Sequence, residues 1–202
     1  YNAAIQNMRS SFGDPGLRQG EPVLNAMGLP MPRSGNFADV YEVRSPATGQ
    51  TWAVKCFKRE VPGLKTRYQQ ISAHLKQTRL PFMVDFDYIE RGVLVRGQWY
   101  PVLKMAWIEG FSLNQIVRDS LDKPGVLKAI LRLWALLAQR LREAQIAHGD
   151  LQHGNVILVP MGDGQSLGLR LIDYDGMFVP SLADTAVGEA GHPNFQHPQR
   201  TR

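Results

Sequence analysis

The sequence predicts an α+β fold, with a strand-rich first part and a helical second part. Apolar residues alternate with polar ones on both sides of a turn at residues 45–50, which is typical of a β-hairpin. Farther along, apolar residues recur at helical spacing from Leu127 to Leu141. The order of these patterns indicates strands with one helix first, followed by a helical part with a small hairpin.

The first part contains five expected strands and one expected helix. Residues 1–30 are polar and rich in Gly and Pro, and we expect them to form an N-terminal extension or a lead-in loop. A helix is expected after residue 63, because four apolar residues fall on one face: Leu64, Tyr68, Ile71 and Leu75. The expected strands are residues 37–43, 51–57, 82–90, 92–96 and 99–107.

The second part begins with a short helix that Ser112 can cap and that reaches about Leu121. A long helix follows from Pro124 to about Gln145, and its apolar stripe is expected to be core. The stripe consists of Leu127, Ile130, Leu131, Trp134, Leu137 and Leu141. Two more strands are expected at residues 156–159 and 168–172.

This organisation predicts two unequal lobes that meet near residues 105–110. We expect a small lobe at residues 31–105 and a large lobe at residues 106–202. Clefts between lobes are preferred ligand sites, so a ligand is expected at the junction.

Composition narrows the function classes. The net charge of +5 suits an anionic ligand such as a nucleotide, but the basic residues are scattered, so no nucleic-acid partner is expected. Cys56 is the only cysteine, which excludes an intrachain disulfide, and the five histidines lack zinc-ligand spacing. No apolar run of 18 residues is present, so we expect no membrane span and a cytoplasmic location. Because the chain starts at Tyr1 without a Met, we expect a piece of a longer, multidomain protein.

Four polar residues have the chemistry that phosphoryl transfer needs. Lys55 lies in an expected strand, Asp150 and Asn155 stand five residues apart after the long helix, and Asp173 follows the last expected strand. A lysine can neutralise phosphates, and a carboxylate can accept a proton from an attacking hydroxyl. Carboxylate and amide oxygens suit Mg²⁺.

At these residues the chain resembles the protein kinase-like family. W-A-V-K at residues 52–55 is similar to V-A-I-K, H-G-D-L-Q-H-G-N at 148–155 to H-R-D-L-x-x-x-N, and D-Y-D at 173–175 to D-F-G. The stretch M-A-W-I-E-G-F-S-L at 105–113 resembles the segment that joins kinase lobes. The stretch G-H-P-N-F-Q-H-P-Q at 191–199 resembles the segment that ends in A-P-E.

The resemblance implies an atypical bacterial serine/threonine kinase domain with a bilobal fold. Its β-rich small lobe would carry one main helix, and its helical large lobe would be truncated at Arg202. Lys55 would contact the phosphates of ATP, and Asp150 would be the catalytic base. Asn155 and Asp173 would hold Mg²⁺, and the acceptor would be a Ser or Thr hydroxyl of a protein or peptide.

The resemblance also implies where ATP would bind. Met105 would lie at the back of the adenine pocket, and backbone groups of residues 106–108 would hydrogen-bond adenine. The expected nucleotide-binding residues are Gly35, Val40, Ala53, Lys55, Met105, Ala106, Trp107, Ile108 and Ile157.

Several positions depart from the family pattern. The glycine-rich loop reads R-S-G-N-F-A-D-V and keeps Gly35 alone of three glycines, which predicts weaker phosphate binding. Gly149 replaces the H-R-D arginine, Gln152 replaces a frequent lysine, and Asp175 replaces the D-F-G glycine. His148 is interpreted as a structural residue that holds the loop.

A further departure concerns the partner of Lys55. In the family an acid on the first helix pairs with this lysine, but residues 61–84 contain no Asp or Glu. The candidates at that depth are Gln69 and Gln70, and helical geometry allows only one of them to face inward.

Two alternatives stay open at this point. The degraded glycine loop favours a pseudokinase that binds nucleotide or acts as a scaffold without turnover. The H-G-D-L variant favours a small-molecule kinase of the aminoglycoside or choline kinase type.

Overall fold

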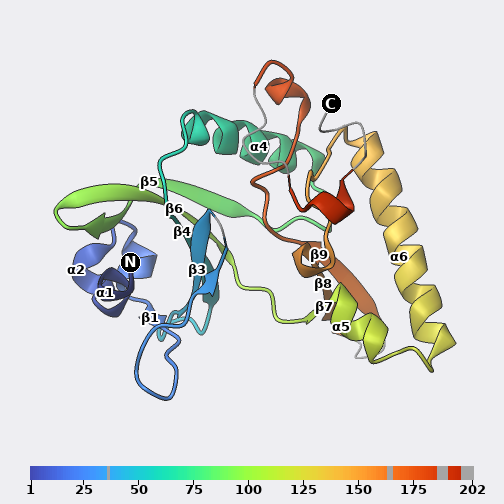
Figure 1. Ribbon diagram of the computed structural model, residues 1–202, viewed down its shortest axis with the longest axis horizontal. Coiled ribbons are helices and arrows are strands. Elements are labelled where there is room, and N and C mark those ends of the chain that lie inside the picture. The colour runs from blue at the N-terminus through green and yellow to red at the C-terminus, as the bar shows by residue number, and fades with distance from the viewer. Residues whose placement is uncertain (36, 163–165, 186–190, 197–202) are drawn as a thin grey trace. The chain divides into compact units, whose positions relative to one another are not determined.

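The computed structural model describes residues 1–35, 37–162, 166–185 and 191–196. The fold is α+β, with antiparallel sheets and, among the described residues, two long helices (Figure 1). The chain divides into two compact units. The first comprises Tyr1–Gln69 and Asp85–Trp107, and the second comprises Gln70–Val84 and Ile108–Arg202.

The first unit is built on an antiparallel sheet in the order β1-β3-β4-β6-β5, with β2 also paired to β3. Its strands are β1 (Glu21–Pro22), β2 (Arg33–Ser34), β3 (Ala38–Arg44), β4 (Thr51–Phe57), β5 (Phe86–Val95) and β6 (Gln98–Ala106). The hairpin of β3 and β4 confirms the prediction from the alternating pattern, and β6 lies within one residue of its expected range.

One face of this sheet forms the core of the first unit. Successive side chains of a strand point to opposite faces, so Tyr41 and Val43 of β3 share a face with Val54 and Cys56 of β4. These four side chains are buried, and Val102 of β6 joins them. Cys56 therefore lies in the core, as expected, and burial raises the pKa of its thiol to about 12.

Helices at the N-terminus cover this core, which corrects the expectation of a lead-in loop. They are α1 (Asn2–Gln6), α2 (Met8–Ser11) and α3 (Pro15–Arg18), and Figure 1 shows α1 and α2 beside the end of β5 that leads to β6. Ile5, Met8, Phe12 and Leu17 are buried in the same cluster as the sheet residues. Each helix is too short to show a helical repeat in sequence, so only the sheet beneath them explains their apolar residues.

The expected strands at 82–90 and 92–96 are a single strand, β5, and residues 82–85 precede it. The register with β6 shifts between Ile89 and Val93, so a bulge bends the strand instead of ending it. Gly92 sits at this bulge because a Cβ there would lie 2.5 Å from Cγ2 of Val102.

The helix α4 (Leu64–Thr78) begins in the first unit and ends in the second. Tyr68 is fully buried among the rings of Phe57, Phe86 and Tyr88, at centroid distances of 5.5–6.0 Å. Toward its other end, the His74 ring Nε2 is 2.8 Å from the Ala144 carbonyl oxygen. These contacts explain why residues 70–84 group with the second unit and not with the small lobe expected at residues 31–105.

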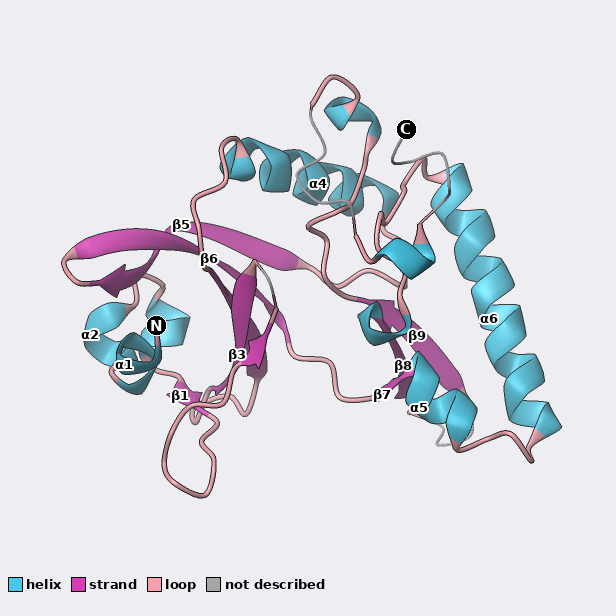
Figure 2. Cartoon of the chain, viewed as in Figure 1, coloured by secondary structure: helices cyan, strands magenta, loops and turns pink. Residues whose placement is uncertain are grey.

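The second unit contains a three-stranded antiparallel sheet and most of the remaining helices (Figure 2). The sheet order is β7-β8-β9, from β7 (Phe111–Ser112), β8 (Val156–Pro160) and β9 (Leu167–Leu171). The α-helices that follow β7 are α5 (Leu113–Arg118) and α6 (Pro124–Glu143), and short 3₁₀ turns lie at His153–Asn155, Pro180–Leu182 and Pro193–Phe195. The Leu171 amide donates to the Phe82 carbonyl at 2.8 Å, which ties the segment after α4 to the end of β9.

The apolar stripe of α6 is core only in part. Ile130, Leu137 and Leu141 are buried, but Leu131 is 67% exposed. Leu131 is rotated by about 100° from its neighbour Ile130, which is enough to turn it out of the covered face. The expectation that the whole stripe is core was therefore wrong. None of the described helices is long and apolar enough to cross a membrane.

We expect Gly92→Ala to lower the free energy of unfolding by about 1–3 kcal/mol, because its methyl group would clash with the backbone and side chain of Val102. Urea unfolding followed by circular dichroism measures the change. Gly125→Ala on α6 is the control, since a Cβ there meets no atom within 4 Å, and its stability should be unchanged or slightly raised. Equal stability of the two variants would contradict the close approach at the bulge.

Candidate functional site

The loop between α6 and β8 is shaped by a buried histidine and a glycine. His148 is 1% exposed, and its ring Nε2 is 3.1 Å from the Ile172 carbonyl oxygen. Gly149 has a φ of 81°, a left-handed conformation that an L side chain rarely adopts. Gly149 therefore meets a backbone requirement of the loop, and His148 holds the loop as expected.

Three hydrogen-bond donors hold the carboxylate of Asp150. Oδ2 accepts from Nε2 of Gln152 at 2.8 Å and from Nδ2 of Asn155 at 2.9 Å, while Oδ1 accepts from the His192 backbone amide at 2.7 Å. The donors are two side-chain amides and one backbone amide, so none of them brings a charge. The arrangement fixes the direction of the carboxylate.

Asn155 joins the two ends of this loop. It is buried, and its Nδ2 also donates to the Asp150 carbonyl at 3.0 Å. Its backbone carbonyl accepts from the Ile172 amide at 3.1 Å, which brings the chain before Asp173 alongside. Since the amide nitrogen is used on Asp150, Oδ1 is the atom of this side chain that suits a cation.

Asp173 has a φ of 65°, an uncommon conformation for a residue other than glycine. Strained backbone of this kind costs energy and clusters at functional sites. The carboxylates of Asp173 and Asp150 both act electrostatically on His148, so both acids lie near the same buried ring. Asn155 and Asp173 offer an amide oxygen and a carboxylate, which are ligand types that Mg²⁺ prefers. Among the described residues, no group of three or more His, Cys, Asp or Glu is placed to hold a metal ion.

Tyr174 anchors the segment that carries Asp173. Its side chain is fully buried, and its hydroxyl accepts from the Val84 amide at 2.7 Å and donates to the Leu171 carbonyl at 2.9 Å. Its ring meets His148 edge to face at 6.0 Å. Tyr174 thus anchors the segment through both ring packing and hydrogen bonds.

Residues 191–196 pack on the same loop, which the sequence did not reveal. Nε2 of Gln196 donates to the Gly149 carbonyl at 2.8 Å, and a Cβ on Gly191 would lie 2.6 Å from that carbonyl oxygen. The Phe195 ring contacts the ring of His153 edge to face at 5.5 Å. We expected no chemical role for His192, and its contact with Asp150 is made by its backbone amide. Because almost every residue has such an amide, the residue type at position 192 could not predict this contact. Residues 197–199 of the expected A-P-E-like segment lie outside the described residues.

In the first unit, strand register gathers the expected nucleotide-binding residues on one sheet face. Val40 pairs with Lys55, and Ala53 pairs with Met105. All four point away from the face that α1–α3 cover, because that face takes the alternate residues. Val40, Ala53 and Lys55 are half-buried, and Met105 is buried.

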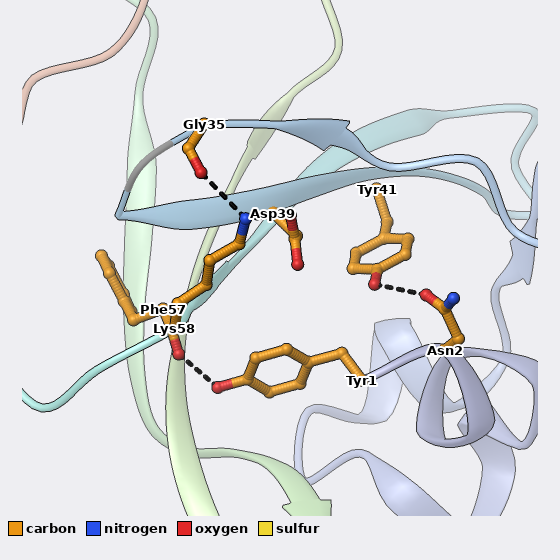
Figure 3. Close-up of polar contacts among 7 residues, drawn as sticks. All are labelled: Tyr1, Asn2, Gly35, Asp39, Tyr41, Phe57 and Lys58. Atoms are coloured by element: carbon orange, nitrogen blue, oxygen red, sulfur yellow. Dashed lines mark hydrogen bonds and ion pairs between the residues drawn. The ribbon is translucent and has the colours of Figure 1, made fainter.

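The loop between β2 and β3 holds Gly35, and Asn36 lies outside the described residues. The Gly35 amide donates to the Ala38 carbonyl at 2.9 Å. Lys58 donates to the Gly35 carbonyl at 2.9 Å and pairs with Oδ1 of Asp39 at 3.0 Å (Figure 3). The side chain of Lys58, the residue directly after β4, therefore braces this loop.

The strand behind the loop is braced from the other side by N-terminal residues (Figure 3). The Tyr1 hydroxyl donates to the Phe57 carbonyl, and the Tyr41 hydroxyl donates to Oδ1 of Asn2 at 2.6 Å. Burial, and to a smaller degree nearby Cys56, raises the pKa of both phenols to about 12, so both remain protonated donors.

The remaining expected residues lie at the unit boundary and in the second sheet. Ala106 pairs with Trp52, and the Trp107 amide donates to the Thr51 carbonyl at 2.9 Å, so that amide is already used within the first unit. Ile108 is half-buried and begins the second unit. Ile157 is buried in β8.

Of the two glutamine candidates on α4, Gln70 is the half-buried one and Gln69 is exposed. Oε1 of Gln70 is buried and has no hydrogen-bond partner among the described residues. Its position agrees with the geometric expectation that only one of the pair faces inward.

No protein-family model matches the chain, and no significant match to a curated protein is found.

We expect Tyr174→Phe to lower the free energy of unfolding by about 1–3 kcal/mol, because the buried Val84 amide would lose its acceptor while the packing of the ring stays. Urea unfolding measures the difference. Tyr100→Phe is the matched control: its hydroxyl donates to Oε1 of Gln98 at an exposed position, so the change should be below about 0.5 kcal/mol. A loss of similar size in both variants would contradict the anchoring role.

We also expect the free energy of unfolding to decrease as the pH is lowered, because of His148. Burial lowers its pKa from the ordinary 6.5, outweighing Asp173, Asp150 and nearby backbone groups, which raise it. The unfolded state therefore takes up this proton first, and the free energy of unfolding decreases as pH falls below about 6.5 toward the folded-state pKa. Urea unfolding at several values between about pH 7.5 and 5.5 checks this, because the carboxylates stay largely ionised there.

His148→Gln should flatten this pH dependence while a side-chain amide still reaches toward the Ile172 carbonyl. His74→Gln, at a half-buried site, is the control and should keep it. A slope that persists in His148→Gln would assign the titration to another group.

Proposed function

We propose that this chain is an ATP- and magnesium-dependent phosphotransferase of the protein kinase-like type, acting on Ser or Thr hydroxyls of proteins. The observation that carries the proposal is the loop at residues 148–155, in which a carboxylate is oriented by neutral donors beside an amide and a second acid. Phosphoryl transfer depends on positioning and electrostatic stabilisation, and these residue types supply both. The order of the matching motifs along the chain supports the same bilobal fold.

In this proposal Asp150 is the catalytic base. Its carboxylate would orient the acceptor hydroxyl and take its proton, which requires a fixed direction and a free lone pair. Gln152 and Asn155 supply the fixed direction, since both donate to Oδ2. The His192 amide on Oδ1 places residues 191–196 next to the base, and this supports a protein acceptor that contacts that segment.

Asn155 and Asp173 would hold the magnesium ion. Their oxygen atoms fit its preference, and the left-handed backbone of Asp173 is the kind of strain that a binding site retains. When bound, the metal neutralises phosphate charge. Lys55 would contact phosphate oxygens, and Val40, Ala53 and Met105 would offer an apolar surface to adenine on the same face.

The alternative hypothesis is a pseudokinase that binds nucleotide without useful turnover. It is favoured by the β2–β3 loop, which keeps Gly35 alone and is braced by Lys58 instead of presenting several flexible backbone amides. A small-molecule kinase is the second rival, and H-G-D-L is its support.

We expect alanine variants of the two acids to fail differently. Asp173→Ala should weaken Mg²⁺-dependent ATP binding by about ten-fold or more, because it removes a metal ligand. Asp150→Ala should keep that binding within about two-fold while phosphate transfer falls by about 10²–10⁴-fold, because the base acts on the acceptor. Calorimetry measures binding, and radiolabelled ATP with protein and small-molecule acceptors measures transfer.

Asp122→Ala, at an exposed carboxylate of the second unit, is the control and should change neither quantity. Equal loss of binding in both site variants would overturn the division of roles. A wild-type chain that binds MgATP but transfers to no acceptor would establish the pseudokinase instead.

A further inference from the structure

The first unit carries a groove that plays no part in the proposed chemistry. It lies between the N-terminal helices and strands β5 and β6, has a volume of about 670 Å³, and is lined in part by Phe12, Pro15, Arg18, Arg91 and Trp99. The groove thus combines aromatic and apolar surface with two guanidinium groups. Both arginines are exposed, so their donors face solvent.

Two smaller hollows of about 400 Å³ each continue from this groove. All three share Arg18, and the two smaller ones also share Arg9 and Gln19. A row of connected hollows suits an extended ligand better than a single small anion. Arginines at three places along the row would contact successive groups of such a ligand.

The cationic side chains are held in place before any ligand binds. Nε of Arg18 donates to the Arg9 carbonyl at 3.0 Å, which orients the rest of its guanidinium group. The guanidinium carbon of Arg91 lies 5.0 Å from the ring centroid of Trp99. Arginine forks that are already ordered lose less entropy on binding carboxylate or phosphate groups.

Asp14, an acid on the wall of the groove, is already paired. Its Oδ1 accepts from the Leu17 amide at 2.8 Å and from Nζ of Lys104 at 2.9 Å. Glu21 lines one of the smaller hollows. Because Asp14 is paired with Lys104, it does not neutralise Arg18 and Arg91 on the same wall.

We propose that this groove binds an acidic peptide segment, one whose anionic side chains are carboxylates or phosphates. Arg18 and Arg91 would bind these groups through bidentate hydrogen bonds, and Phe12, Pro15 and Trp99 would pack against its apolar residues. A peptide fits better than nucleic acid, because the basic residues of the chain form no continuous run. The edge of β5 beside the groove is already used by the N-terminal segment, where Phe12 pairs with Val93 and the Gly13 amide donates to the Gly92 carbonyl at 3.0 Å, so binding would depend on side chains.

Fluorescence polarisation with three labelled peptides of one sequence tests the proposal. Each peptide is about ten residues long, which is about 33 Å when fully extended. They carry phosphoserine, aspartate or asparagine at the same positions. We expect both anionic peptides to bind at least about ten-fold more tightly than the asparagine peptide, and more weakly as salt rises. The stronger of the two identifies phosphate or carboxylate as the group that the arginines prefer.

Variants locate the site. Arg18→Gln combined with Arg91→Gln should weaken anionic-peptide binding by about ten-fold or more. Arg59→Gln is the matched control, because Arg59 also stacks on a ring, that of Phe37, but does not line the groove, and it should bind as the wild type does. Asp173→Ala should also keep peptide binding, which separates this proposal from the proposed phosphotransfer.

Two results would overturn the inference. One is equal binding of the asparagine and anionic peptides to the wild-type chain, a measurement that needs no variant to fold. The other is displacement of both anionic peptides by a single-stranded oligonucleotide of equal charge at lower concentration, which would make the groove a nucleic-acid surface.

Discussion

The second unit depends most on the hydrogen bonds that the side-chain amide of Asn155 donates. Its nitrogen donates both to the carboxylate and to the carbonyl of Asp150, so it closes a loop of six residues. Its backbone carbonyl meanwhile receives the amide of Ile172. One buried residue thereby connects the segment after α6, the start of β8 and the end of β9, and it sets where Asp150 and Asp173 stand.

The neighbours of this loop show how closely it is packed. Gly149 adopts a backbone conformation that favours glycine, and Gly191 approaches its carbonyl where no side chain would fit. His148 and Tyr174 fill the space beneath and are both fully enclosed. In such a setting a charge is costly unless it is compensated, and three hydrogen-bond donors contact the carboxylate of Asp150.

The first unit uses both faces of its sheet. The three short N-terminal helices cover one face, which carries the buried side chains of the core cluster. The opposite face carries Val40, Ala53 and Lys55, and part of it is covered by Tyr68 of α4, which packs on Phe57, Phe86 and Tyr88. The N-terminal helices also create the arginine-lined groove, because their connections leave gaps beside the bent strand β5.

The sequence alone could predict those elements that are set by local patterns of residues. The β3–β4 hairpin, α4, α6 and the strands after the loop follow from periodicity and turn residues, and their bounds agree with the structure within a few residues. The sequence also predicts a chemical role for four polar residues, because their types and order suit phosphate and Mg²⁺: Lys55, Asp150, Asn155 and Asp173. Their joint function remains a prediction, since residue types do not measure activity.

Tertiary structure alone decided the rest. Helices of four or five residues have no visible period, so α1–α3 became evident only against the sheet that they cover. The bulge at Gly92 depends on the nearness of Val102, and the exposure of Leu131 depends on which side of α6 is covered. The contact between Asp150 and the amide of His192 joins residues 42 positions apart through backbone. Such contacts depend on the path of the whole chain, and no local pattern of residue types encodes them.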